Sequence, residues 1–554
     1  MKTSPYTTLD LWKVIACRVR GAKQEGQGRP PKGAASNGYH RHLLGPVDHA
    51  IVILRLEQNV ADRRKIMDIS AEQPTRCDVI IRGGVVIDGT GAPRYSADVA
   101  VSEDRIVAVG ELSGIAADHE VLAEGAVVAP GFIDVHTHDD GALLAQPEMT
   151  PKISQGVTTV IAGNCGFSLA PLRPRAPLAQ EFRYLGEDSD YRFDTMAAYV
   201  AAFEAAPATV NAALLVGHST LRAATMDDLD RPASDREIAS MRALLREAID
   251  SGASGFSTGL EYPTNRAATT AEIVAVAEEM AATGGIYTTH YRDYVYDIDG
   301  AMEEAFEIGR RAGVQVHLSH HQLDSIHLHG RADQTLRRID RARVGQSVSL
   351  DVYPYTAGGG AIMEEFVAVA KKVVITRSAA RPDCAGRDLS EIARDWGCSP
   401  VEAAGRLKPG GAIYFLQDEE DMRRILSYRH TSIGSDSLPF EPIPHPRLWG
   451  TFPRVLGHYA RDLGLFTMEE AVHRMTGLAA AQFGFVNRGV VRPGAYADLV
   501  VFDAERVIDR ATYEEPERLS EGIVLVMVNG IPVWRNGVAT GERSGRIVRR
   551  EIPI

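Results

Sequence analysis

Short apolar runs alternate with amphipathic stretches along the middle of the chain. The amphipathic stretches, such as residues 235–252 and 270–285, repeat apolar residues at helical spacing and end at glycine, which is typical of helices. The apolar runs end in polar residues or glycine, as buried parallel strands do. There are eight of them, at 131–140, 156–165, 211–220, 253–262, 285–293, 314–322, 348–356 and 431–439. Eight strands alternating with helices predict a (β/α)8 barrel of the TIM type over residues 131–486.

Alternating β-branched runs flank this middle part on both sides. Residues 77–91 predict a hairpin that turns at Gly83-Gly84, and residues 97–110 predict a second that turns at Glu103-Asp104. Near the other end, residues 522–537 predict a hairpin at Asn529-Gly530. We therefore expect a small β-sandwich domain that combines residues 71–130 with residues 487–554.

One gap interrupts the alternation of strands and helices. Residues 357–430 separate the seventh and eighth apolar runs, and residues 386–407 inside this gap have the pattern of helices. The gap predicts an insertion that lies as a lid over the mouth of the barrel.

The composition excludes several classes of function. The chain has 554 residues, of which 45% are hydrophobic and 24% charged, values ordinary for a globular protein. A net charge of −13 argues against nucleic acid as a partner, because such binding begins with neutralising phosphates. No apolar run approaches the roughly 18 residues of a membrane span. Five scattered cysteines favour a reducing compartment, so we expect a cytoplasmic protein; the oligomeric state stays open.

The first 70 residues differ from the rest. Residues 1–76 hold thirteen Lys and Arg against seven Asp and Glu, and residues 21–37 are rich in Gly, Pro and Lys without apolar periodicity. We expect residues 1–70 to be a dispensable extension, or the chain to start at Met67. An organelle transit peptide is the alternative that the basic bias leaves open.

Metal-binding side chains stand where five of the predicted strands end. Because the carboxyl ends of barrel strands form the active face, these side chains should lie close together. Each has a plain alternative, such as a cysteine that only fills the core. Imidazole, thiolate and carboxylate are the zinc ligands of proteins, and five donor positions at matching strand ends predict a metal site. The candidates are His136, His138, Cys165, His290, His320, His321 and Asp436.

Several motifs resemble the D-aminoacylase family of the amidohydrolase superfamily. The sequence GFIDVHTH at 131–138 looks like the first barrel strand of the superfamily. More specific likenesses to the D-aminoacylases are GNCG at 163–166, IGSDSLP at 433–439 and HPRLWGTFPRVLGHY at 445–459. The resemblance spans roughly residue 77 to the C-terminus, and it implies the same barrel, β-domain and lid.

The resemblance also implies roles for the donors. Cys165, His290 and His320 would hold one tight zinc, while His136, His138 and Asp436 would form a second, weaker position. Cys165 stands where many relatives in the superfamily have a modified lysine that bridges two metals, which favours one essential metal. His321 follows a ligand and should point to the opposite strand face, where a supporting or packing role fits better.

The activity that the resemblance implies is zinc-dependent hydrolysis of N-acyl-D-amino acids to a D-amino acid and a carboxylic acid. Zinc lowers the pKa of a water molecule toward ~7 and polarises the amide oxygen. Asp436 would accept the water proton and pass it to the leaving amine. Asp436 could instead serve only as a metal ligand or cap the GSDS turn.

The chain departs from the family pattern where the substrate should bind. The sixth strand usually ends His-His-Lys, with the lysine on the substrate carboxylate, but here it ends with Gln322. Counting two residues from His320 places Gln322 on the barrel-facing side. Arg292 could hold the carboxylate, the substrate could lack one, or a residue of the lid could compensate for a neutral change at Gln322. Tyr353 is retained, and Tyr262 is a further candidate substrate contact.

Two other functions stay open at this point. The chain could hydrolyse another linear or cyclic amide, such as a D-residue dipeptide or a natural-product amide, because Gln322 replaces the lysine. It could also be a barrel that has lost catalysis and serves in an assembly, although the complete ligand set argues against that.

Overall fold

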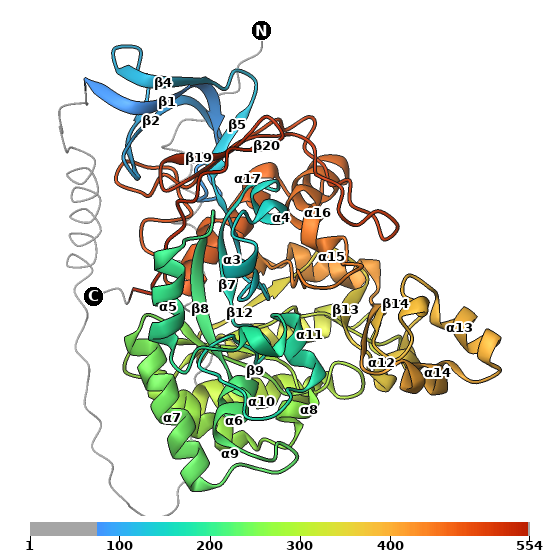
Figure 1. Cartoon of the computed structure of the whole chain (residues 1–554). Coiled ribbons are helices and arrows are strands. Elements are labelled where there is room, and N and C mark those ends of the chain that lie inside the picture. The colour runs from blue at the N-terminus through green and yellow to red at the C-terminus, as the bar shows by residue number, and fades with distance from the viewer. Residues whose placement is uncertain (1–74, 552–554) are drawn as a thin grey trace, which may run out of the picture. The chain divides into compact units, whose positions relative to one another are not determined.

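The computed structural model describes residues 75–551, so the predicted extension over residues 1–70 lies outside the described residues. Its central element is a sheet of eight parallel strands in sequence order, which confirms the predicted (β/α)8 barrel (Figure 1). Every strand lies within one of the eight apolar runs. The strands are β6 (Phe132–Asp134), β7 (Val157–Ala162), β8 (Asn211–Gly217), β9 (Gly255–Gly259), β10 (Ile286–His290), β11 (Gln315–Leu318), β12 (Val348–Val352) and β16 (Thr431–Ile433).

The barrel closes where the segments after β6 and β16 meet. The amide of Val135 donates to the carbonyl of Ile433 at 3.3 Å, and the amide of Asp436 donates to the carbonyl of His136 at 2.8 Å. Thr137 and Ser437 continue this pairing as a parallel bridge. We call the contact between residues 134–138 and 431–437 the seam. It brings the first and last strands together at the end of the barrel where the histidines stand.

Both helices expected from the sequence are present, but the stretch over 235–252 ends as a helix at Asp250 and the stretch over 270–285 at Ala277, before their glycines. Ser234 caps α7 (Asp235–Asp250) in a reciprocal arrangement with Glu237, and α10 (Ile298–Ala312) ends at the left-handed Gly313. The other helices of the barrel region are α3 (Ala142–Ala145), α4 (Thr150–Ile153), α5 (Met196–Ala205), α6 (His218–Thr225), α8 (Pro263–Arg266), α9 (Thr270–Ala277), α11 (Ala332–Ala342), α15 (Glu419–Ser427), α16 (Arg447–Arg454), α17 (Met468–Met475) and α18 (Gly477–Phe483).

Strands from both ends of the described chain share one nine-stranded sheet. β5 pairs with the antiparallel β17, so the two ends join at this point. Side chains from both ends, among them Ile81, Val99, Leu499 and Met527, share one apolar core. The strands are β1 (Arg76–Val86), β2 (Tyr95–Ser102), β3 (Arg105–Gly110), β4 (Ala116–Leu122), β5 (Val127–Pro130), β17 (Leu499–Phe502), β18 (Ile523–Val528), β19 (Ile531–Arg535) and β20 (Val538–Ala539).

Two of the three predicted hairpins are confirmed and one is wrong. β2 and β3 turn at Glu103-Asp104, and β18 and β19 turn at Asn529-Gly530. Gly83-Gly84, in contrast, lies inside the continuous strand β1, where the register against β2 shifts between Ile81 and Gly84. Glycine pairs suit a bulge as well as a turn, and here the strand continues through the bulge.

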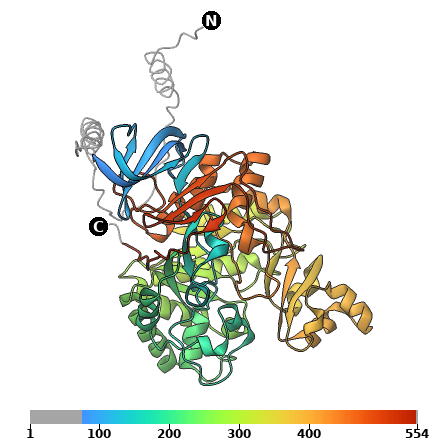
Figure 2. The same ribbon diagram turned by 45° about the horizontal axis from the view of Figure 1, so that its top comes forward.

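The insertion between β12 and β16 forms a lobe with its own apolar core (Figure 1). It contains β13 (Gly358–Ala361), β14 (Lys372–Ser378) and β15 (Gly410–Phe415), with α12 (Glu364–Val369), α13 (Leu389–Trp396) and α14 (Pro400–Leu407). Figure 2 shows the same lobe in a view tilted by 45°. The following helix α15 packs on α11, so it belongs to the barrel. Among residues 75–551, no helix is long and apolar enough to cross a membrane.

Candidate metal centre

Six donor side chains converge at the carboxyl ends of five barrel strands. His136 and His138 follow β6, Cys165 follows β7, His290 ends β10, His320 follows β11 and Asp436 follows β16. Each of the six is buried, with at most 9% of its surface exposed. Their donor atoms form two groups that share Cys165, and within each group the atoms lie within 4.8 Å of one another.

The first group consists of Cys165, His290 and His320. Cys165 Sγ lies 3.4 Å from His320 Nε2, and His290 Nδ1 lies 3.1 Å from the same nitrogen. One thiolate and two imidazoles leave a fourth position free for water or substrate, which is the arrangement of a catalytic zinc site.

The second group adds His136, His138 and Asp436 on the other side of the thiol. His136 Nε2 lies 3.1 Å from Cys165 Sγ, and His138 Nε2 lies 3.3 Å from Asp436 Oδ1. His138 Nδ1 is buried without a hydrogen-bond partner among the described residues. Because Cys165 belongs to both groups, a single thiolate can contact ions at both positions.

The charges of this cluster favour the metal-binding form of the thiol. Burial opposes ionisation of Cys165, but the neighbouring imidazoles of His136 and His320 outweigh it and hold the pKa of this thiol well below its usual range. Burial similarly lowers the pKa of His290, yet contacts with Cys165 and Glu261 raise it to about 9. A thiolate surrounded by imidazoles is a donor set that fits zinc.

Three of the six donors have left-handed backbone conformations. The φ angles are 52° at Cys165, 31° at His320 and 48° at Asp436. Residues other than glycine seldom adopt such angles, and each costs roughly 1–3 kcal/mol. Strained backbone that turns three donors toward one point is typical of a functional site.

Carboxylates behind the donors fix the orientation of the imidazoles. Asp351 Oδ2 lies 3.2 Å from His136 Nδ1, and Asp351 Oδ1 accepts the backbone amide of His320 at 2.9 Å. Glu261 accepts from His290 Nε2 at 3.0 Å. Such contacts leave the opposite ring nitrogen free for a metal. The sequence pattern did not single out either carboxylate, although both lie within the apolar runs.

A buried lysine holds the seam beneath the donors. Lys152 Nζ donates to Asp134 at 2.8 Å and to the hydroxyls of Ser435 and Ser437 at 3.0 and 2.7 Å, and it lies 3.2 Å from Asp139. Its partners flank His136, His138 and Asp436 in the sequence. Sequence analysis missed this residue, because nothing in the run TPKIS distinguishes it from an exposed lysine.

A small cavity opens above the donors and is roofed by the insertion. Its volume is about 50 Å³, which is room for a few water molecules. His138, His290, His320 and Asp436 border it, together with the predicted contacts Tyr262 and Tyr353. β13, α12 and β15 contribute the roof.

The structure places Gln322 and Arg292 away from this cavity. Gln322 is buried and donates to the carbonyl of Tyr353 at 3.0 Å. In a strand, side chains alternate between the two faces, and the prediction for Gln322 relied on this alternation. The left-handed backbone of His320 ends the alternation, so the residues after it do not point to the expected faces. Arg292 binds Glu304 at 2.8 Å and the carbonyls of Arg266 and Ala268, so its guanidinium is fully engaged elsewhere.

His321 forms hydrogen bonds of 3.0 Å with Tyr291 and Thr335, which is a packing role.

Arg447 is the cation that sequence analysis missed at the site. It starts α16 within the HPRLWG motif, is 1% exposed, and its Nη1 lies 2.8 Å from Asp436 Oδ2. The guanidinium carbon lies 4.5 Å from the ring centre of Tyr353. Nη2 donates to the carbonyl of Gly359 at 3.3 Å, whereas Nε has no hydrogen-bond partner in the described range. Burying a cation with unused donors is costly, which suggests a ligand for it.

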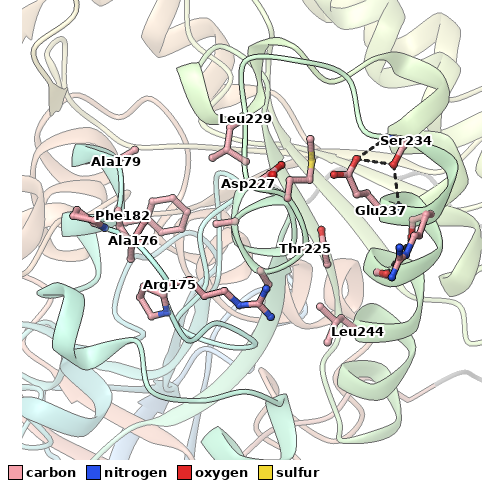
Figure 3. A pocket seen from close by; sticks show the side chains of 18 of the residues that line it. Arg175, Ala176, Ala179, Phe182, Thr225, Asp227, Leu229, Ser234, Glu237 and Leu244 are labelled. Atoms are coloured by element: carbon pink, nitrogen blue, oxygen red, sulfur yellow. Dashed lines mark hydrogen bonds between the residues drawn. The ribbon is translucent and has the colours of Figure 1, made fainter.

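A larger hollow lies elsewhere. It measures about 1060 Å³ and is lined by residues 174–182 and by residues of α6 and α7, including Arg175, Asp227 and Glu237 (Figure 3). Glu237 is occupied by the cap of α7, bonded to Ser234. None of the six donors lines this hollow, so size alone does not identify the reaction site.

Comparison with known proteins shows which families the chain resembles over most of its length. The model of the amidohydrolase family matches residues 120–375 and 340–534. A D-aminoacylase of Alcaligenes xylosoxydans xylosoxydans is 52% identical over 487 residues, covering 87% of this chain and 99% of the relative. An N-acyl-D-aspartate deacylase of the same organism is 48% identical, covering 86% and 96%. A crystal structure of N-acyl-D-glutamate deacylase from Bordetella bronchiseptica, with zinc and a phosphonate inhibitor, is 44% identical with a TM-score of 0.83, covering 86% and 100%.

Proposed function

The chain belongs to the amidohydrolase family and, within it, to the D-aminoacylases, and from this premise we propose that it hydrolyses the amide bond of N-acyl-D-amino acids. The products are a D-amino acid and a carboxylic acid. The observation that carries the proposal is the convergence of Cys165, His290 and His320 with Asp436 at the mouth of the barrel.

We assign one tight zinc to Cys165, His290 and His320, and a weaker position to His136, His138 and Asp436. The thiolate and the two imidazoles of the first group supply three zinc ligands. None of them is a carboxylate, so Asp436 stays available for proton transfer. Zinc held there would lower the pKa of a water molecule and polarise the amide carbonyl.

Asp436 is the proton carrier of the reaction. Burial favours the neutral acid, but Arg447 and the imidazoles of His320 and His138 outweigh it and hold the pKa of Asp436 well below its usual range. The carboxylate is therefore ready to accept a proton from the attacking water. As the oxygen–carbon bond forms and the carbon–nitrogen bond breaks, Asp436 returns this proton to the leaving nitrogen.

Arg447 is our candidate for the group that binds the substrate α-carboxylate. Its Nε has no partner in the described range, and its guanidinium contacts Asp436 and Tyr353, which both line the cavity although Arg447 itself does not. Gln322 and Arg292 are both bonded elsewhere. A guanidinium can bind a carboxylate through two parallel hydrogen bonds. With Arg447 in this role, the loss of the lysine at position 322 no longer favours a substrate without a carboxylate.

A paired-enantiomer assay tests the proposal. The zinc-loaded protein is given N-acetyl-D- and N-acetyl-L-methionine, and release of acetate is measured, with Asp436→Asn as the control for contaminating activity. We expect turnover of the D-enantiomer and at least about 100-fold slower turnover of the L-enantiomer, a difference of about 2.7 kcal/mol in the barrier. Equal rates for the two enantiomers, or none for either, would reject it.

A further inference from the structure

A carboxylate without a counter-ion borders the cavity above the donors. Asp324 follows β11 and lines this cavity, to which it is partly exposed. Its Oδ1 accepts a hydrogen bond of 2.6 Å from Gln417 Nε2. Within residues 75–551, no Lys, Arg or His nitrogen lies within ion-pairing distance of Asp324, whereas the similarly placed Glu261 contacts His290.

The cavity offers no cation to an acidic substrate side chain. Its lining contains neither lysine nor arginine, and apart from the imidazoles its charged members are Asp324 and Asp436. Burial raises the pKa of Asp324 to about 6, which still leaves most of the carboxylate ionised at neutral pH. A negative substrate group beside Asp324 would be repelled, and a positive one would be attracted.

Asp324 lies on the side of the cavity that belongs to the amino-acid half of the substrate. Gln417 Nε2, which binds Asp324, also lies 3.4 Å from the hydroxyl of Tyr353. The ring of Tyr353 contacts the guanidinium of Arg447, our candidate for the α-carboxylate. Asp324 is thus linked through Gln417 to the tyrosine that Arg447 contacts, and the amino acid, not the acyl group, carries the carboxylate.

Apolar side chains complete this part of the cavity. Met363, Phe366 and Leu416 of the insertion line it together with Leu438. Methylene groups pack favourably on such a surface, while a charged end needs a polar partner. A side chain with an apolar stem and a cationic end can pack against these apolar residues and pair with the carboxylate of Asp324.

We propose that Asp324 makes this chain select N-acyl-D-amino acids with a cationic side chain, that is, an amine or guanidinium on an apolar stem. The inference rests on the proposed function and goes beyond the acidic side chains that two of the relatives are named for. Asp324 acts by binding the substrate, and Gln417 orients its carboxylate.

The test compares substrates that have the same shape and differ in charge. N-acetyl-D-arginine and N-acetyl-D-citrulline form such a pair, with N-acetyl-D-glutamate as the acidic substrate. A hydrogen bond to a charged group contributes roughly 1.5–3 kcal/mol, which is about 10- to 150-fold in kcat/KM. We expect the native chain to prefer arginine over citrulline by about tenfold or more and to be slowest on glutamate.

Asp324→Asn keeps the shape and a hydrogen-bonding oxygen but removes the charge. This variant should bring the arginine-to-citrulline ratio to about 1–3, leave citrulline nearly unchanged and improve glutamate by about tenfold, in line with the same contact energy. Asp383→Asn, an exposed change within the insertion, is the matched control and should keep the native ratio.

Three outcomes would overturn the inference. If the native chain turns over arginine and citrulline equally, the carboxylate selects nothing. If Asp324→Asn slows all substrates by the same factor, Asp324 only holds Gln417 and the insertion in place. If no N-acetyl-D-amino acid is hydrolysed, the proposed function fails together with the inference, whereas the first two outcomes leave that function intact.

Discussion

At the scale of single residues, Cys165 is the donor that both metal groups share. Replacing it with alanine removes the thiolate and should give a folded protein that retains little zinc after dialysis. Activity should fall by at least about 100-fold, because metal ions supply several kcal/mol of charge stabilisation in the transition state. Zinc content by atomic absorption and helix content by circular dichroism measure the two effects separately.

Cys384→Ala is the matched control for this prediction. Cys384 is fully buried in the core of the insertion and contacts no donor, so its loss should leave the zinc content unchanged. A full equivalent of zinc in Cys165→Ala would mean that the thiolate is not a ligand.

Asp436 contributes more to the rate than to metal retention. Asp436→Asn should keep the tight zinc and lower kcat by about 10²–10⁴-fold, the usual contribution of a general base. Single-turnover rates and zinc content measured on the same sample test this. If the variant instead loses zinc and added zinc restores its rate, Asp436 is chiefly a ligand.

The convergence of the candidate donors was predictable from the sequence, whereas the placement of the candidate substrate contacts was not, for a physical reason. His136, His138, Cys165, His290 and Asp436 stand at strand ends, and the barrel repeat alone brings strand ends together. Contacts such as Arg447 and Asp324 depend on how loops and the insertion pack, which no periodicity records. At Gln322, the left-handed backbone of His320 breaks the alternation from which its direction was predicted.

At the scale of elements, the seam depends on the ion pairs of Lys152. Lys152→Met would leave Asp134 and Asp139 buried without their cation, which typically costs about 3–5 kcal/mol. We expect the free energy of unfolding in urea to fall by that amount. Kinetic assays below the transition should show a lower kcat with KM nearly unchanged, because the seam positions Asp436 and does not contact substrate.

Lys408→Met provides the comparison for Lys152. Lys408 pairs with Glu364 at 2.9 Å, but both side chains are more than a third exposed, and such pairs contribute roughly 0–1 kcal/mol. If the two variants lower the free energy of unfolding equally, the ion pairs of Lys152 do not stabilise the seam.

A buried carboxylate between α6 and α9 contributes a stabilisation of the fold that is lost in acid. Glu272 pairs with Arg222 and lies 3.3 Å from His218 Nε2. Burial opposes its ionisation, but the contacts with His218, the amide of Ala233 and Arg222 outweigh it and lower its pKa to about 2. Because the folded pKa is below the unfolded one, this group stabilises the fold above pH ~4.5, and the contribution is lost as the pH falls toward 2.

Glu272→Gln isolates this contribution. At pH 7 the variant should be less stable by about 3–5 kcal/mol, since Arg222 is left buried without its anion. The difference from the native chain should shrink as the pH falls below ~4.5, because the carboxyl of the unfolded chain then takes up a proton while that of the folded chain, with its pKa of about 2, stays ionised. Chemical unfolding at pH 7, 5 and 3 measures it, with the exposed Glu307→Gln as control. A difference that is constant over this range would contradict the assigned charge state.

The elements themselves were largely predictable, because each follows from a local pattern. For each of the eight barrel strands and for the capped helix α7, the residues that predict the element lie close together in the sequence. The exception at Gly83-Gly84 shows the limit of local patterns. Whether two glycines form a turn or a bulge depends on the partner strands, and here β1 extends past them to pair with β5.

At the scale of the whole molecule, the described residues 75–551 contain the candidate site and its supporting cores. The D-aminoacylase relative is matched over 99% of its length by 87% of this chain. We therefore expect a protein that begins at Met67 to bind zinc and hydrolyse substrate with an unchanged kcat/KM. Zinc content and initial rates of the two forms test this. Loss of solubility or activity on truncation would show that residues 1–66 contribute to the fold.

The seam between β6 and β16 also determines the order in which the enzyme can mature. It joins Asp134 to Ser435, two residues 301 positions apart, and closing so long a loop is slow and entropically costly. Cys165, His290 and His320, in contrast, are all synthesised before the insertion and can capture zinc while the last strand is still missing. On the proposed ligand assignment, a chain arrested before residue 431 should bind zinc and lack Asp436, so metal uptake and catalytic competence would be separate events in biogenesis.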